Sequence, residues 1–171
     1  MDTIIQFSGL KCATYTFKYE LRKDFLEPFK NENLSDCKVF FEVKLEKKER
    51  LLMFYFTFEG EVITTCDRCL EELSIPVSGT NTLCVKFSDT EMSDDEDAIF
   101  LPEKECKIDL AQWMYEYIVV SMPIQCIHPD DEDGNPTCNP EMMKYITQES
   151  QTEQSQEEEI DPRWAALKNL K

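Results

Sequence analysis

The sequence predicts an α+β fold in which one amphipathic helix covers an antiparallel sheet or a partly closed β-barrel. Two observations favour this class. Apolar and polar residues alternate through much of the first hundred positions, which is typical of strands with one buried face. After position 109 the apolar spacing becomes helical, and a short second helix is predicted at the C-terminus. With 171 residues and 42% apolar content, the chain is long enough for one ordinary core.

The alternating segments predict a β-hairpin at the centre of the sheet. Apolar side chains alternate from Val39 to Leu45 and again from Phe54 to Phe58, and the polar stretch EKKER separates the two runs. Residues 83–87 repeat the pattern, and the stretches IIQF and ATYTFKYEL near the start predict two further strands. The stretch DFLEPF, at 24–29, predicts a short helical turn before the hairpin.

The main helix is predicted to begin after Asp109, whose side chain suits an N-cap, and to end before Pro123. Its apolar positions recur at helical spacing, so one side of the helix would cover the sheet. The apolar positions are Leu110, Trp113, Met114, Tyr117 and Ile118. The chain has only four glycines and no glycine-rich phosphate loop, so we predict no nucleotide site.

The net charge of -17 is concentrated in three segments, 89–97, 130–133 and 149–159. Together they hold fifteen acidic residues and no Lys or Arg, which leaves twenty acids against eighteen bases in the rest of the chain. Such tracts are either solvated loops and tails or contacts for a basic partner such as a ribosomal protein. The remainder is nearly neutral.

The chain contains no run of eighteen apolar residues, and its start resembles no signal peptide. We therefore expect a cytoplasmic protein with no membrane partner. We also predict no small-molecule substrate. In a reducing compartment, its eight cysteines are expected to be thiols or metal ligands rather than disulfides.

A candidate zinc site combines Cys66 and Cys69, two residues apart after a predicted strand, with His128 and Cys138 in the loop after the helix. Zinc favours four nitrogen or sulfur ligands, and a CxxC turn supplies two of them. The site would cross-link the sheet to the helix exit. Cys126 is an alternative ligand or a buried thiol. Unligated thiols and redox chemistry remain the other interpretations of these residues.

No catalytic residues are predicted. The chain has a single histidine, and nothing in the sequence supplies a third group or an oxyanion loop beside a Cys–His pair. Pairs of carboxylates do not indicate an acid–base catalytic site here, because they are common by chance in a chain with 35 acidic residues.

The C-terminus predicts a small amphipathic helix, which we call the hook, at 161–171. Asp161 is a suitable N-cap and Pro162 suits the first helical position, while Trp164, Leu167 and Leu170 share one face. A helix this short is marginal in isolation, so the hook is expected to dock on its own domain or on a partner. We accordingly predict a single α+β domain at 1–147, an acidic tether at 148–160, and the hook.

These motifs resemble those of the YceD family of large-ribosomal-RNA accumulation proteins, in the form found among Bacteroidetes-like bacteria. The resemblance rests on CDRCLEEL in mid-chain, YEYIVVSMP at the helix end, the His/Cys loop and the terminal DPRWAALKNLK. It covers nearly the whole chain. The loop departs from the cysteine-rich versions of the family, which carry paired CxxC motifs there.

The resemblance implies a bacterial or organelle-derived, non-enzymatic factor for the accumulation and processing of large-subunit ribosomal RNA. The family's cysteine pair corresponds to Cys66 and Cys69, and its later His and Cys positions correspond to His128 and Cys138. Its signature tail corresponds to the expected partner-binding residues, Asp161, Pro162, Arg163, Trp164, Ala165, Leu167 and Lys168.

Two mechanisms fit this role. In the first, the nearly neutral part of the chain outside the acidic segments binds pre-ribosomal RNA through basic groups such as Lys44, Lys47, Lys48 and Arg50. In the second, the acidic segments shield a basic ribosomal protein. The strong acidity favours the second. Two other classes of function remain as alternatives: a thiol-based oxidoreductase that uses Cys66 and Cys69 with His128 as base, and a zinc-stabilised interaction module unrelated to ribosomes.

Overall fold

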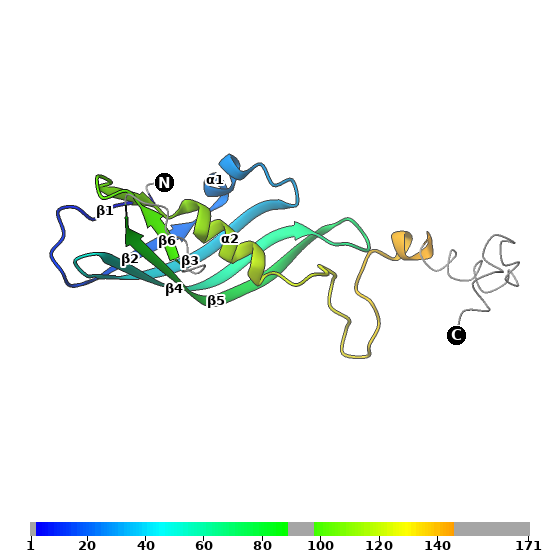
Figure 1. The fold of residues 1–171 in the computed structure, drawn as a ribbon. Coiled ribbons are helices and arrows are strands. Elements are labelled where there is room, and N and C mark those ends of the chain that lie inside the picture. The colour runs from blue at the N-terminus through cyan, green and yellow to red at the C-terminus, as the bar shows by residue number, and fades with distance from the viewer. Residues whose placement is uncertain (1–2, 89–97, 146–171) are drawn as a thin grey trace, which may run out of the picture. The chain divides into compact units, whose positions relative to one another are not determined.

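The computed structural model describes residues 3–88 and 98–145 (Figure 1). The chain divides into two units. The first comprises Met1–Cys66 and Glu72–Cys126, and the second comprises Asp67–Glu71 and Ile127–Lys171. The predicted tether and hook, at 148–160 and 161–171, lie outside the described residues.

The first unit is built on a five-stranded sheet with the order β2-β3-β4-β5-β6. The bounds are β2 (Thr14–Leu21), β3 (Leu34–Lys47), β4 (Leu51–Thr65), β5 (Glu72–Phe87) and β6 (Ala98–Leu101). The first four strands are antiparallel, and β6 pairs with β5 in parallel. The predicted α+β class is confirmed. Of the two sheet forms considered, the structure has the open one, since β2 and β6 are edge strands and do not pair with each other.

The predicted central hairpin is confirmed as β3 and β4, with Val43 paired to Phe56 across the strands. Side chains on one face are buried and those on the other face are exposed, as the alternation in the sequence requires. The buried face carries large apolar side chains that are at most 3% exposed, namely Val39, Phe41, Val43, Leu45, Leu52, Phe54, Phe56 and Phe58. These residues form the centre of the core.

Gly60 allows β3 and β4 to approach closely in the middle of the sheet. A Cβ atom at this position would overlap the backbone carbonyl oxygen of Lys38 and the Cα of Val39. Because that clash involves backbone rather than a flexible side chain, only glycine fits without a shift of the strands.

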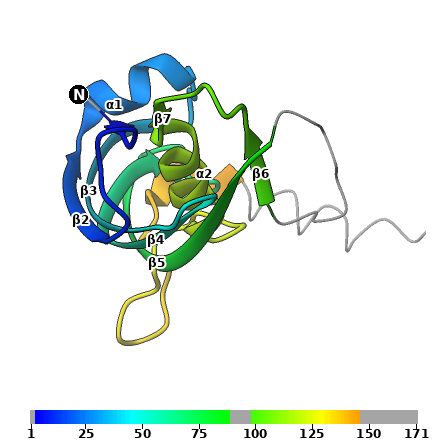
Figure 2. The ribbon, with the colours of Figure 1, turned by 60° about the vertical axis from the view of Figure 1, so that its left-hand side comes forward.

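Helix α2 (Ala111–Ser121) covers the buried face of the sheet, which curves around it (Figure 2). Met114 and Ile118 are fully buried, and the rings of Tyr117 and Phe56 meet edge to face with centroids 5.1 Å apart. The predicted helix is thereby confirmed. It ends at Ser121, two residues before Pro123.

The start of α2 differs by one residue from the prediction. Leu110, not Asp109, is the N-cap residue, yet the Asp109 carboxylate accepts a hydrogen bond of 2.9 Å from the backbone N–H of Ala111. Asp109 also accepts a 2.6 Å hydrogen bond from the Thr3 hydroxyl. A second sheet, formed by β1 (Ile4–Gln6) and β7 (Lys107–Asp109), holds these two residues together.

The helical turn predicted at 24–29 is present as α1 (Lys23–Leu26) followed by the 3-10 helix η1 (Glu27–Phe29). The Phe29 ring stacks on Tyr115 of α2 with centroids 4.1 Å apart. Asn31 donates a 2.8 Å hydrogen bond to the Tyr115 hydroxyl. This segment therefore holds α2 in place through Tyr115.

Strands β6 and β7 were not predicted, because each has only three or four residues, which are too few to define a period. Within residues 3–88 and 98–145, no helix combines the length and the apolar character that a bilayer crossing requires.

Candidate metal centre

The first half of the centre is a tight turn between β4 and β5. Strand β4 ends at Thr65, and Cys66 and Cys69 then lie at the two ends of a turn that precedes Glu72. The two cysteines are 0% and 3% exposed. A CxxC turn of this kind directs both sulfur atoms to the same side, which is how such turns hold metal ions.

Leu70, the residue after this turn, has an unusual backbone conformation. Its φ is +61°, in the left-handed region, and its side chain is 68% exposed. For a residue other than glycine, this conformation costs about 1–2 kcal/mol. This unfavourable conformation occurs where the chain leaves the CxxC turn and enters β5.

The second half of the centre is the loop from Ile127 to Asn139. Its tip is closed by Asp131, whose carboxylate accepts hydrogen bonds from the backbone N–H groups of Asn135 and Asp133 at 2.7 and 3.0 Å. Hydrogen bonds from Asn135, first of all from its backbone, lower the pKa of Asp131 because they favour the charged carboxylate. The Thr137 hydroxyl donates a 2.6 Å hydrogen bond to the carbonyl oxygen of Pro129. The loop therefore folds back and brings residue 138 close to residue 128.

The same loop is tied to the CxxC turn by Asn139. Its side-chain amide donates a 2.6 Å hydrogen bond to Glu71, while its side-chain oxygen accepts a 2.9 Å hydrogen bond from the backbone N–H of Glu141. Asn139 thus caps the helical turn that starts at Pro140. Sequence reasoning missed this contact, although Asn followed by Pro is a recognisable start of a helix.

The structure brings together all four residues predicted as metal ligands. One ligand atom from each of Cys66, Cys69, His128 and Cys138 lies within 4.8 Å of the others. The Nδ1 atom of His128 is 3.4 Å from the Cys69 sulfur and 3.9 Å from the Cys138 sulfur. A tetrahedral zinc ion, with bonds of about 2.1 Å to nitrogen and 2.3 Å to sulfur, separates its ligand atoms by roughly 3.6 to 3.8 Å. A Cys3His group with these spacings is able to hold a metal.

Cys126, the alternative ligand, is not a member of this group. Its side chain is half-buried, and its thiol donates a hydrogen bond of 3.6 Å to the carbonyl oxygen of Pro123. Among the described residues, the Cys3His group is the single cluster of at least three metal-binding side chains.

The remaining cysteines differ in accessibility, and this predicts how they react. Cys12 and Cys106 are exposed, whereas Cys37 is 3% exposed, and its burial raises the pKa of the thiol to about 11. Because the thiolate is the reactive form, roughly one Cys37 in a thousand is ionised at pH 8. We expect iodoacetamide at pH 8 to modify Cys12 and Cys106 while Cys37 stays unmodified, as measured by peptide mass spectrometry. Rapid labelling of Cys37 in the folded chain would contradict its burial.

Comparison with known proteins places these residues in a family. The family described as "Large ribosomal RNA subunit accumulation protein YceD" matches residues 54–171, which include all four residues of the Cys3His group. A curated relative, "Uncharacterized protein YlbN" of Bacillus subtilis (strain 168), is 26% identical over 124 residues, which are 72% of this chain and 68% of the relative. No solved structure matches the chain. Since the family match spans more than half of the sequence, the chain belongs to the YceD family.

Proposed function

We propose that this chain is a non-enzymatic ribosome biogenesis factor that supports the accumulation or processing of large-subunit ribosomal RNA. The observation that carries the proposal is the family match over residues 54–171. That match includes the CxxC turn, the His/Cys loop and the C-terminal motif. A cytoplasmic location agrees with this role.

The Cys3His group serves as a structural zinc site in this proposal. A catalytic zinc keeps one coordination position open for water or substrate, whereas a structural zinc has four protein ligands. Four candidate ligands are present here, and three of them are buried. Zinc bound by Cys66, Cys69, His128 and Cys138 would hold the loop and the CxxC turn in one conformation.

The same burial argues against the oxidoreductase alternative. A redox-active CxxC pair needs an accessible thiolate that attacks its substrate. Cys66 and Cys69 are at most 3% exposed, and His128 lies beside Cys69 and Cys138 as a fourth donor. Tight binding of one zinc ion per chain would rule out this alternative, and reversible formation of a Cys66–Cys69 disulfide in the zinc-free native chain would support it.

The partner is pre-ribosomal RNA, a basic ribosomal protein, or both, and we favour the protein. The acidic segments at 89–97, 130–133 and 149–159 repel phosphate and attract basic surfaces. The basic residues proposed for RNA are only partly available. The Lys47 ammonium donates hydrogen bonds of 2.6 and 2.8 Å to the carbonyl oxygens of Phe7 and Leu10, and Lys48 forms an ion pair of 3.3 Å with Glu46.

The hook is the proposed contact with this partner. We expect the full chain to capture large-subunit components from a native bacterial lysate, and a chain that stops at Ile160 to lose them. A full-length variant with Trp164→Ala and Leu167→Ala tests the apolar face alone, and Asn169→Ala is a matched control on the opposite side of the predicted helix. Bound RNA and proteins are identified by sequencing and mass spectrometry.

Treatment of the lysate with ribonuclease separates the two mechanisms. Capture of a basic ribosomal protein after this treatment supports the protein-shielding mechanism, and loss of all capture supports direct RNA binding. If the truncated and full chains capture the same components, the hook is not the contact. If neither captures ribosomal components, the proposed function is wrong for this chain.

A further inference from the structure

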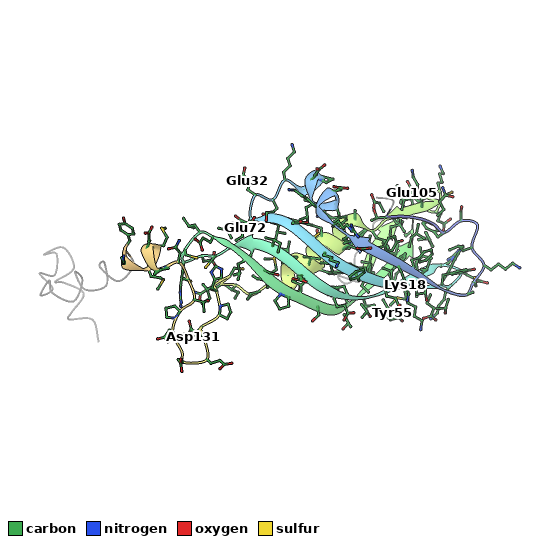
Figure 3. All side chains as sticks on the ribbon, turned by 180° about the vertical axis from the view of Figure 1, so that it is seen from behind. Lys18, Glu32, Tyr55, Glu72, Glu105 and Asp131 are labelled. Atoms are coloured by element: carbon green, nitrogen blue, oxygen red, sulfur yellow. The ribbon has the colours of Figure 1, made fainter. Side chains whose placement is uncertain are left out.

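The sheet has a second face, on the side opposite to α2 (Figure 3). Strands β2, β3, β4 and β5 contribute alternate residues to it, and the strand register aligns these residues in rows across the sheet. The middle row consists of Lys18, Glu42, Thr57 and Thr80. An antiparallel sheet commonly leaves one face in water, so exposure alone does not indicate a partner.

Two aromatic side chains are exposed on this face. Phe40 of β3 is 46% exposed and Tyr55 of β4 is 39% exposed. They lie in the rows on either side of the middle row, because Phe40 pairs with Glu59 and Tyr55 pairs with Lys44. A hollow of about 750 Å³ opens over the middle row and the Phe40 row, and its lining includes Phe40, Thr57 and Thr80.

The charges on this face are separated along the strands. The end that contains Tyr55 carries Lys44, Lys48 and Lys86 against one acid, Glu46. The end that contains Phe40 carries three acids against one base: Glu20, Glu59 and Glu61 against Lys38. At the margin of that end, Arg22 forms an ion pair of 2.7 Å with Glu20, and Asp36 and Glu72 add two further acids. The middle row is neutral, since Lys18 and Glu42 form an ion pair of 3.1 Å.

This distribution restricts which partner fits the whole face. RNA would place phosphates against the acidic end, and a uniformly basic protein would place cations against the basic end. A fitting surface must itself have one basic end, one acidic end and a neutral middle. Rotation by a two-fold axis that runs along the middle row exchanges the two ends of the face, so the basic end of each copy lies over the acidic end of the other.

We propose that this face of the sheet is a homodimer interface, in which a second copy of the chain packs its own Lys44 end over the Glu59 end of the first. Sheets commonly pack face to face with nearly aligned strands, and the two-fold rotation provides that arrangement. Phe40 and Tyr55 of both copies become buried at the centre. The proposal does not depend on the proposed function, because it concerns only this chain.

The size of the face predicts a weak dimer. Strands lie about 4.8 Å apart and rise about 3.4 Å per residue, so residues 38–46 and their neighbours on four strands span roughly 600 Å². Stable interfaces bury about 800 Å² on each partner. We therefore expect dissociation constants in the micromolar range, and association that weakens at high salt because exposed charges are screened.

The test is sedimentation equilibrium of the zinc-supplemented full chain at low salt over a range of micromolar concentrations. The mass is expected to rise from that of the 20.1 kDa chain toward twice that value as concentration increases. In this arrangement Lys44 lies over Phe40 of the second copy, between Glu20 and Glu59. Lys44→Glu and Glu59→Lys therefore each bring like charges together, and each is expected to weaken association at least tenfold. An equimolar mixture of the two variants is expected to associate again, since each charge then faces its opposite. Glu116→Lys, at an exposed position of α2 away from this face, is the matched control and leaves association unchanged.

A constant monomer mass at all concentrations would overturn the proposal, and so would a dimer that neither charge reversal weakens. Two probes test other occupants, a fluorescent ten-nucleotide oligouridine and a fluorescent ten-residue oligolysine. If the chain remains a monomer and Lys44→Glu abolishes oligouridine binding, the face is an RNA surface. If Glu59→Lys instead abolishes oligolysine binding to a monomer, the face binds a basic segment. Either result would reject the homodimer proposal and identify the other partner of this face.

Discussion

The substitution Cys69→Ser is expected to abolish stoichiometric zinc binding and to unfold the loop at 127–139. Cys69 is buried beside His128, and its loss leaves at most three ligands. Structural zinc sites contribute on the order of 10 kcal/mol to the folding of the segments that they hold, so the effect should be the largest of any single substitution in this region. Metal content is measured by atomic emission, and order in the loop by amide hydrogen exchange.

The matched control is Cys84→Ser. Cys84 lies on β5, is half-buried, and is not a member of the Cys3His group. This variant is expected to retain one zinc ion per chain and the protection of the loop. If the native chain contains no zinc after purification with zinc in the buffer, or if Cys69→Ser retains one ion per chain, the structural-zinc proposal fails.

The second large effect is expected from Phe56→Ala in the core of the first unit. Phe56 is 1% exposed and contacts the ring of Tyr117 on α2, so truncation removes a buried ring and leaves a cavity between sheet and helix. Substitutions of this kind cost about 3–5 kcal/mol. Urea denaturation followed by far-ultraviolet circular dichroism measures the loss.

Thr57→Ala is the control, since Thr57 is the next residue on β4 and faces solvent. It is expected to change the free energy of unfolding by less than about 0.5 kcal/mol. A loss below about 1 kcal/mol for Phe56→Ala would mean that α2 does not cover this part of the sheet.

The long elements of this fold could be predicted because burial imposes a clear period on the sequence. The hairpin of β3 and β4 follows from alternation over many residues, and α2 follows from helical spacing between Asp109 and Pro123. Strand β6 could not be predicted, because four residues show no period and its pairing with β5 depends on the tertiary fold. The same reason explains why β7 was missed.

The residue types of the candidate metal ligands could be predicted from the sequence. The loop conformation and the contacts that bring these residues together could not. A CxxC turn and a single histidine identify possible donors, whereas their convergence depends on how the loop after α2 folds back. The left-handed conformation of Leu70 could not be predicted, because leucine is among the residues that disfavour it. The contact between Asn139 and Glu71 depends on residues 68 positions apart.

The separation of the ligands along the chain has a consequence for protein synthesis. Cys69 and His128 are 59 positions apart. A ribosome therefore releases the CxxC turn long before the other two proposed ligands emerge, and during that time the turn offers a metal ion only two sulfur ligands. Closing a loop of this length opposes completion by on the order of 4 kcal/mol of chain entropy. Folding of the intervening strands and α2 shortens that search, so the metal centre is completed late in the biogenesis of the chain.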